Sequence, residues 1–304
     1  MNSPWLHRYA QVTAAAAFFV IFAGAMVTST GSGMAVPDWP TSFGGWMPRM
    51  EGGVFYEHGH RVVAGAAGLL TMGLALSAQL SHQRPQVRRL AWYAFLAIVA
   101  QGLLGGTTVL LGTSYGWDHT SPLVSTLHAG LAQALFALLV SLAVVTGKGW
   151  EKAPTLESAA SYRRLGLFTV AAVYIQIILG AVMRHQNAGL IIPDFPLSYG
   201  RLIPEIHEWR VGLNYAHRIG ALCVLTLALT LSASVLKNIR AAWLRLPAKI
   251  LMAAVVLQVS LGATVVWSRL QPLVTSAHVI GGALVLASSL VLTMRLHKAG
   301  SHGV

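Results

Sequence analysis

Long apolar stretches dominate the pattern of hydrophobic and polar positions along the chain. A helix that crosses a membrane needs roughly 20 mostly apolar residues. Eight stretches meet that length, and we expect spanning helices at about 8–28, 57–79, 88–112, 122–146, 162–184, 212–235, 243–267 and 272–295. The stretches are too long and too unbroken to be the strands of a membrane barrel. The pattern therefore predicts an all-α polytopic membrane protein with eight transmembrane helices.

The first apolar stretch could also be a secretory signal peptide. It is long, it lacks a convincing cleavage site, and its far end matches a later part of the chain, so we interpret it as a retained helix. No Arg- and Ser-rich leader precedes it. A multi-pass protein of the bacterial inner membrane is the simplest expectation.

Composition agrees with this picture and gives it an orientation. The 304-residue chain is 55% hydrophobic and only 10% charged, whereas a soluble domain carries about 25% charged residues. The net charge of +12 would suggest a nucleic-acid partner if its placement were ignored. With the N-terminus inside, however, 14 of the 21 basic residues fall on inner segments. This positive-inside bias predicts that both termini are cytoplasmic, and it indicates no nucleic-acid partner.

The chain repeats its own plan. Residues 37–40 read Pro-Asp-Trp-Pro and residues 193–196 read Pro-Asp-Phe-Pro, an offset of 156. Four further positions recur at similar offsets: Gly24 with Gly180, His60-Arg61 with His217-Arg218, Gly105 with Gly262, and His128 with His278. The repeat predicts two tandem four-helix bundles.

Each predicted bundle has four spans, which is an even number. Both bundles should therefore point the same way through the membrane and be related by a pseudo-two-fold along the membrane normal. We expect an N-terminal half at 1–147, a charged cytoplasmic linker at 148–163 and a C-terminal half at 164–304.

Histidines are the candidate chemical groups. Eight of the twelve lie in loops, tails or span edges, where each is expected to be solvated or interfacial: His7, His58, His82, His119, His185, His207, His297 and His302. The other four lie in the outer thirds of the even-numbered spans: His60, His128, His217 and His278. Two helices of each half thus offer one imidazole each at similar depth, which favours the binding of a haem iron from both faces. Zinc or copper is less suitable, because nothing nearby supplies the further ligands of a closed site.

Small residues accompany these histidines. Each His is followed four residues later by Ala or Gly, on the same helix face, which leaves room for a flat macrocycle: Ala64, Ala132, Ala221 and Gly282. Spans three, five and seven also carry Gln-x-x-Leu-Gly, beginning at Gln101, Gln176 and Gln258. We interpret the latter motif as close helix packing with interhelical hydrogen bonds.

Two charged positions near the histidines suggest further roles. Arg61 and Arg218 follow the first His of each pair and suit the anionic propionates of a haem, although an interfacial arginine without haem is the alternative. Glu57 stands one turn before His60, while the aligned residue in the second half is Asn214. A carboxylate can exchange protons or hold a reacting water. We therefore expect chemistry in the first half and a resident haem in the second. A structural pairing of Glu57 with Arg61 at i+4 is the other interpretation.

The chain resembles the haem A synthase family from about Gly24 to the eighth span. The resemblance rests on Glu57-x-x-His60-Arg61, the Pro-Asp-Trp-Pro loop, His128 in STLHAG, His217-Arg218 in NYAHR and His278 in TSAHV. It implies an enzyme, a membrane-bound haem-dependent oxidoreductase, that converts the C8 methyl of haem O to the formyl of haem A. The methyl would be hydroxylated twice, and the geminal diol would lose water.

The resemblance also implies a division of roles. Substrate haem O would be bound by His60 and His128, with Glu57 as the catalytic acid and Arg61 as a propionate or substrate contact. A haem b cofactor would be bound by His217 and His278, with Arg218 beside it. Expected partners are haem O and haem A, membrane lipid, a haem O synthase, cytochrome oxidase assembly factors and an electron donor that the sequence does not specify.

One feature departs from some members of that family, which carry a Cys pair in each long outer loop. The only cysteine here is Cys223 in the sixth span, so no internal disulfide forms. The sequence resembles the cysteine-free bacterial members. The two Pro-Asp-aromatic-Pro loops are expected to be rigid connections at the membrane interface, with a lid over each haem as the alternative.

Two other functions are compatible with the pattern. A two-haem b-type membrane cytochrome that acts only as an electron carrier would have no special need for Glu57. A transporter with a parallel repeat would place ionisable residues near the middle of the membrane, whereas here they gather toward the outer end.

Overall fold

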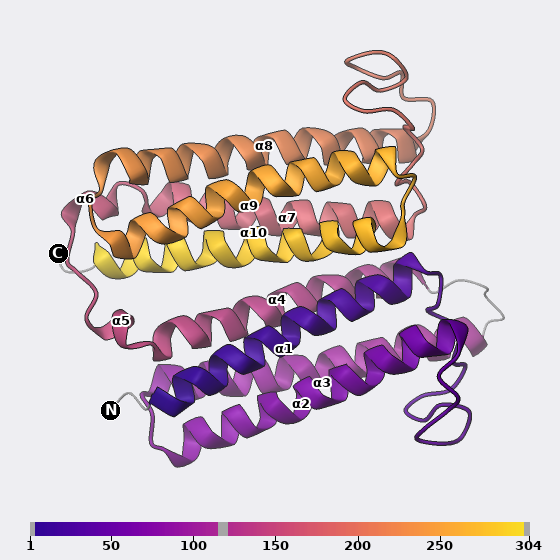
Figure 1. Ribbon diagram of the computed structural model, residues 1–304, viewed down its shortest axis with the longest axis horizontal. Coiled ribbons are helices and arrows are strands. Elements are labelled where there is room, and N and C mark those ends of the chain that lie inside the picture. The colour runs from indigo at the N-terminus through magenta and orange to yellow at the C-terminus, as the bar shows by residue number, and fades with distance from the viewer. Residues whose placement is uncertain (1–3, 115–120, 301–304) are drawn as a thin grey trace.

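The computed structural model describes residues 4–114 and 121–300, and in them the chain is all-helical apart from loops (Figure 1). The first four long helices are α1 (Pro4–Ser29), α2 (Gly52–Leu80), α3 (Pro85–Ser114) and α4 (Pro122–Thr146). Two short helices follow, α5 (Lys148–Glu151) and α6 (Glu157–Ala160). The last four are α7 (Arg163–His185), α8 (Trp209–Asn238), α9 (Ala242–Trp267) and α10 (Pro272–Ala299).

Among the described residues, eight helices are long and apolar enough to cross a membrane, which confirms the predicted all-α, eight-span fold. The helices extend beyond the apolar stretches at several ends. Thus α2 begins at Gly52 rather than near residue 57, and α8 begins at Trp209 rather than near 212. Backbone hydrogen bonding continues into the polar boundary because every buried N–H and C=O still needs a partner there. As a result, Glu57 lies within α2 rather than at its first residue.

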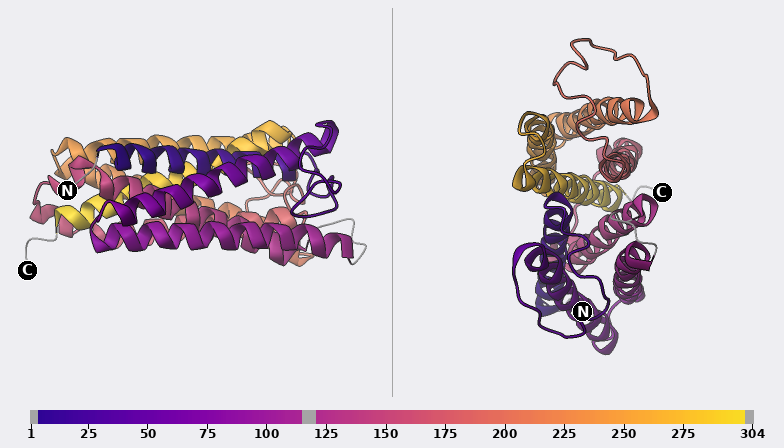
Figure 2. Two further views of the ribbon diagram at one scale, coloured as in Figure 1. Left: turned by 90° about the horizontal axis from the view of Figure 1, so that it is seen from below. Right: turned by 90° about the vertical axis from the view of Figure 1, so that its right-hand side faces the viewer.

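The long helices form two groups. In the first group, α1 and α3 each pack on both α2 and α4. In the second group, α7 and α9 each pack on both α8 and α10. The groups meet through α1, α4, α7 and α10. Figures 1 and 2 show them side by side with all eight long helices running roughly parallel or antiparallel.

The side chains explain why the bundle is stable in lipid. Each group has its own core of fully buried aliphatic residues, including Leu74 and Leu139 in the first and Leu231 and Leu251 in the second. Large apolar side chains such as Phe168 remain two-thirds exposed. A helix that is apolar on all sides is suited to lipid on the face that protein does not cover.

The two longest loops described, 30–51 and 186–208, leave the same end of the bundle. The linker that contains α5 and α6 lies at the opposite end. Viewed down the helices, the loops lie at opposite ends of an elongated cross-section (Figure 2). Each loop therefore belongs to one helix group.

Candidate functional site

The four predicted ligand histidines lie near the loop end in two pairs. His60 of α2 interacts electrostatically with His128 of α4. His217 of α8 interacts in the same way with His278 of α10. Residues that are 68 and 61 positions apart in the sequence are thus brought together inside each helix group.

Each of these imidazoles packs against a glycine of the preceding helix. A Cβ added at Gly24, Gly105, Gly180 or Gly262 would lie 2.9–3.1 Å from the Cε1 of His60, His128, His217 or His278 respectively. Such contacts are closer than real Cβ atoms normally make. The imidazoles therefore occupy space that a side chain at these positions of α1, α3, α7 and α9 would fill. This explains why glycine recurs there.

The donor set fits a haem. The Nδ1 atoms of His60, His128 and His278 are buried and have no hydrogen-bond partner among the described residues. Buried polar atoms normally have a partner, and an imidazole nitrogen is a good axial ligand of haem iron. In the described part of the chain no group of three or more His, Cys, Asp or Glu side chains could hold a metal ion. Two imidazoles from different helices of one group suit an iron whose other ligands come from a porphyrin.

Glu57 is buried, with 4% of its surface exposed, and both carboxylate oxygens are occupied. Oε2 accepts a hydrogen bond from the Val36 backbone N–H at 2.9 Å, and Oε1 accepts one from Arg61 at 2.6 Å. The i+4 pairing with Arg61 is therefore present in the structure. Glu57 consequently fastens loop 30–51 to α2, one helical turn from His60.

Arg61 and Arg218 both bind the loop that precedes their helix. Arg61 donates to the backbone carbonyls of Val36, Asp38 and Thr41 as well as to Glu57. These bonds use four of the five N–H donors of the guanidinium. A propionate contact at Arg61 would have to use the fifth donor or displace a loop carbonyl.

The second half repeats this arrangement with an amide in place of the carboxylate. Arg218 donates to the carbonyls of Ile192, Asp194 and Leu197, and its Nε donates to Asn214 Oδ1 at 2.9 Å. Asn214 in turn donates to the carbonyls of residues 188 and 189. The two halves thus share the fastening of the loop, and they differ in the ionisable group.

The geometry that the two loops share is held by their aspartates. Asp38 accepts hydrogen bonds from the Thr41 hydroxyl and from the N–H groups of Phe43 and Gly44. These bonds, that of Thr41 first, lower the pKa of Asp38 to about 2. Asp194 accepts from the N–H groups of residues 199 and 200, and the Gly200 bond is the main cause of its lowered pKa. Both aspartates therefore have a structural role in their loops.

The loop aromatics lie over the outer ends of neighbouring helices. A Cβ at Gly106 of α3 would be 2.5 Å from the Trp39 ring, so the indole lies against the residue next to Gly105. Phe195 makes an edge contact with Trp267 of α9, with 6.0 Å between ring centroids. Trp39 thus lies beside the glycine that contacts His128, and Phe195 lies against the end of α9.

The glutamines of the Gln-x-x-Leu-Gly motif make the interhelical hydrogen bonds expected of them. Gln101, Gln176 and Gln258 donate to the backbone carbonyls of His128, His217 and His278 at 3.0, 2.7 and 3.0 Å. The Gln-x-x-Leu-Gly spacing was the available signal, but it does not name the partner.

The expectation for His58 was wrong. This side chain is buried, and its Nδ1 lies 2.8 Å from Ser42 Oγ in the loop, because α2 begins early enough to turn it inward. His119 and His302 lie outside the described residues.

Arg184 was also missed, because only the tertiary structure shows its partners. At the outer end of α7 it donates to the Ala25 carbonyl and to Ser29 Oγ of α1 at 3.1 and 2.6 Å. Ser29 Oγ is 3.0 Å from Ser276 Oγ of α10. This chain of hydrogen bonds joins the two helix groups between the two histidine pairs.

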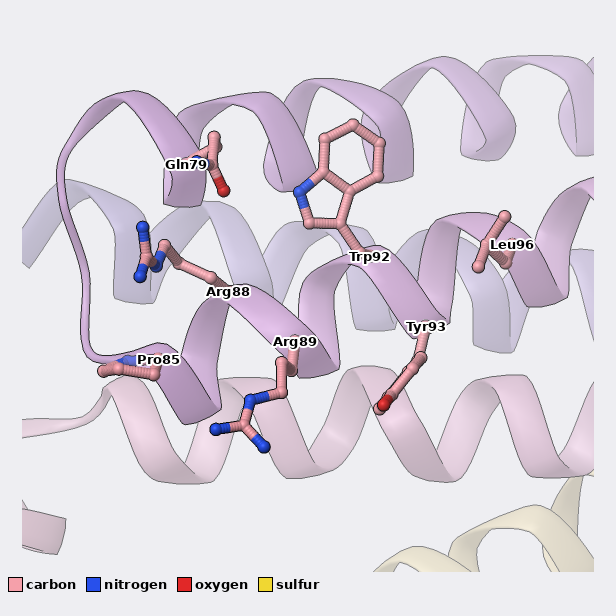
Figure 3. Close-up of a pocket in the computed structure, with 7 residues that line it drawn as sticks. All are labelled: Gln79, Pro85, Arg88, Arg89, Trp92, Tyr93 and Leu96. Carbon is pink, nitrogen blue, oxygen red and sulfur yellow. The ribbon is translucent and has the colours of Figure 1, made fainter.

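A surface pocket lies away from these residues, at the opposite end of the bundle. Figure 3 shows it along α3, lined by Arg88, Arg89, Trp92 and Tyr93 with Gln79 of α2. Arginines beside Trp and Tyr are typical of the membrane–water interface. The pocket therefore does not belong to the candidate haem sites.

Together, the fold and the site define a multi-pass helical membrane protein with two histidine pairs suited to axial ligation of haem. Comparison with known proteins gives the family. A family profile described as cytochrome oxidase assembly protein (COX15-CtaA) matches residues 51–290. The haem A synthase of Shouchella clausii is 31% identical over 97% of this chain and 98% of its own length. That of Geobacillus kaustophilus is 30% identical over 97% and 93% of the two chains. The chain belongs to the haem A synthase family, and the prediction of an enzyme of this family is confirmed.

Proposed function

We propose that the protein is a haem A synthase that converts the C8 methyl of haem O to the formyl of haem A for haem-copper oxidase assembly. Two successive hydroxylations, each a two-electron oxidation that takes one oxygen atom and an oxidant from outside the chain, put two hydroxyl groups on the methyl carbon, and loss of one water then leaves the formyl. The observation that carries the proposal is the presence of a buried carboxylate, Glu57, beside only one of the two histidine pairs.

The two halves have different roles in this proposal. Residues 1–147 bind substrate haem O through His60 and His128, and residues 164–304 bind haem b through His217 and His278, with the cytoplasmic linker 148–163 between them. The proposed pseudo-two-fold is supported by the matching loop contacts, since the arginines at 61 and 218 bind equivalent carbonyls.

The residues of the chain act by positioning and proton transfer. Glu57 is held by the Val36 N–H and by Arg61, so its carboxylate has a fixed place one turn from His60. From there it takes a proton from the reacting substrate or orients a water. Loop 30–51, with Trp39 over α3, limits the access of bulk water. A haem b held by His217 and His278 would supply a redox centre for electrons from an external donor.

We also propose the cellular setting. The positive-inside bias places both termini in the cytoplasm and the loop end, with both haem sites, at the periplasmic face of the bacterial inner membrane. A haem O synthase would supply the substrate, and cytochrome oxidase assembly factors would receive haem A.

Pigment analysis tests the reaction. Cells that make haem O and express the protein should yield a haem bearing a formyl group on extraction. Glu57→Gln keeps an oxygen that can accept from Val36 N–H but removes the ionisable group, so haem A should fall to background while the haem b spectrum persists. Glu51→Gln is the matched control, because Glu51 is exposed and pairs only at the surface with Arg49. Unchanged haem A in Glu57→Gln would contradict the assigned role.

The contacts of Glu57 with Val36 and Arg61 give it a structural role that requires no chemistry. The alternative function is therefore a two-haem b-type cytochrome that only carries electrons. That function predicts bound haem b and no haem A from the wild-type protein. Either function requires His217→Ala and His278→Ala to lose haem b, and full retention of haem in both variants would exclude these ligands.

A further inference from the structure

Three of the four histidines are tied to the preceding helix by a glutamine, and the fourth is not. The glutamine side-chain N–H groups bind the backbone carbonyls of His128, His217 and His278. At the position of α1 that corresponds to Gln176, with the offset of 156, the chain has Val20. His60 therefore has no glutamine on α1, and its ring interacts with the backbone carbonyl of Val20.

The same glutamines also reach the imidazole rings. Gln176 Nε2 is 2.9 Å from His217 Nδ1, and the corresponding distances to the Nε2 atoms of His128 and His278 are 3.3 and 3.5 Å. One amide thus contacts both the backbone and the ring of a ligand histidine. The bond to the backbone carbonyl is the firmer of the two contacts, and it fixes the position of the histidine-bearing helix relative to the preceding helix.

In the second half, glycines also leave room for the glutamine side chains. A Cβ at Gly220 would be 2.1 Å from Gln176 Oε1, and one at Gly281 would be 2.2 Å from Gln258 Oε1. Each of these glycines lies three residues after a ligand histidine. In the first half, Val63 stands at the position equivalent to Gly220, with the offset of 157. Where the second half has Gln176 with Gly220, the first half thus has Val20 with Val63.

We propose that this difference makes His60 the releasable ligand, so that haem exchanges through the first half and stays in the second. The inference rests on the proposed function, because a substrate site must release its product while a cofactor site must retain its haem. Gln101, Gln176 and Gln258 are positioning residues: they act on haem through the histidines they hold. Without such a tie, no side chain of α1 holds the backbone carbonyl of His60, and a shift of α2 relative to α1 has to break only the contact of the His60 ring with the Val20 carbonyl.

The rate of haem transfer measures the effect directly. The full-length protein, purified in mild detergent and loaded with haem b as the probe, is mixed with excess apomyoglobin, and haem capture is followed by absorbance. We expect a fast phase and a slow phase. The phase that His60→Ala alters reports on the first half, and the phase that His278→Ala alters reports on the second.

Two variants test the tie in opposite directions. Gln176→Val should accelerate the slow phase about three- to tenfold, the factor expected from one interhelical hydrogen bond in a membrane protein. The double variant Val20→Gln/Val63→Gly transplants the tie and its space into the first half, and should slow the fast phase by a similar factor. The matched controls are Gln133→Val, a buried glutamine of α4 for which no bond to a histidine is found in the described structure, and Val63→Gly alone.

The outcomes separate this inference from the proposed function. Unchanged transfer rates in both Gln176→Val and the double variant would overturn the role of the glutamine. If His217→Ala and His278→Ala still lost haem, the proposed ligands would nevertheless be supported. Full haem retention in those two alanine variants would overturn the proposed function itself. Because the readout is haem transfer, neither conclusion depends on enzyme activity.

Discussion

At the scale of single residues, the two halves differ most in one functional group. Glu57 and Asn214 occupy matching positions, and each makes contact with the arginine one turn later. The carboxylate accepts from a backbone N–H, whereas the amide donates to backbone carbonyls. The protein therefore preserves the loop fastening in both halves and keeps an ionisable group in one, as expected if that group has a chemical role in addition to its structural one.

The loop aspartates give a prediction about pH. The pKa of Asp38 is about 2, below its ordinary value near 4. The charged form is thus favoured in the folded loop, and its contribution is present above about pH 4 and lost as the pH falls toward 2. We expect the amides of Phe43 and Gly44 to stay protected from hydrogen exchange above pH 4, relative to their intrinsic rates, and to lose protection between about pH 4 and 2.

The variant Asp38→Asn should lose this protection already at neutral pH, since an uncharged amide is a weaker acceptor for three donors. Glu51→Gln, near the other end of the same loop, should not. Equal protection in Asp38→Asn and the wild type would show that the aspartate does not hold the loop.

At the scale of helices, the candidate haem-ligating histidines are held by pairs of neighbouring helices. Each even-numbered spanning helix contributes a histidine, and the helix before it contributes a glycine against the imidazole ring. Three of these preceding helices add a glutamine on the turn before the glycine. The motif Gln-x-x-Leu-Gly is thus half of a two-helix unit whose other half is the histidine.

Adding one methyl group to such a glycine should disturb the ligand. In Gly180→Ala the new Cβ would lie 2.9 Å from His217 Cε1, and overpacking of this kind costs about 1–3 kcal/mol. We expect the purified variant to hold markedly less haem b than the wild type, as measured by the pyridine haemochrome spectrum. Gly102→Ala is the matched control, because nothing lies within 4 Å of its added Cβ. Equal haem content in the two variants would count against a ligand at His217.

At the scale of the whole molecule, the structure joins two groups of four helices that face the same way. They meet through α1, α4, α7 and α10, and Arg184 with Ser29 and Ser276 connects three of these helices between the histidine pairs. Loops 30–51 and 186–208 leave the same end, opposite the linker. Whatever enters or leaves either site near the loops therefore does so from one side of the membrane.

Cysteine labelling tests which side that is. In a Cys223→Ala background, Trp46→Cys places a thiol on the exposed part of the first loop, and Lys152→Cys places one on the linker. A membrane-impermeant maleimide should label residue 46 in intact spheroplasts and residue 152 only after lysis, because basic residues concentrate on the cytoplasmic side. The reverse pattern would invert the proposed orientation and place both haem sites at the cytoplasmic face.

Much of the fold was predictable because hydrocarbon imposes a simple rule. A spanning segment must be apolar and must satisfy its own backbone hydrogen bonds, so eight long apolar stretches predict eight helices. The internal repeat similarly predicted which histidines and glycines correspond. The ends of α2 and α8 were less predictable, since they depend on interactions with loops 30–51 and 186–208.

By itself, the sequence determined the membrane-spanning class and the internal repeat, because these follow from composition and spacing along one chain. The family followed from the resemblance of its motifs and from comparison with known proteins. Only the tertiary structure decided the partners: Gln176 on His217, Arg61 on the carbonyls of its loop, and Arg184 between the helix groups. Such partners depend on the rotation and depth of one helix relative to its neighbour. Hydropathy determines neither the rotation nor the depth, because any apolar face of a helix can lie against lipid. Close packing of helices at glycine positions selects one arrangement.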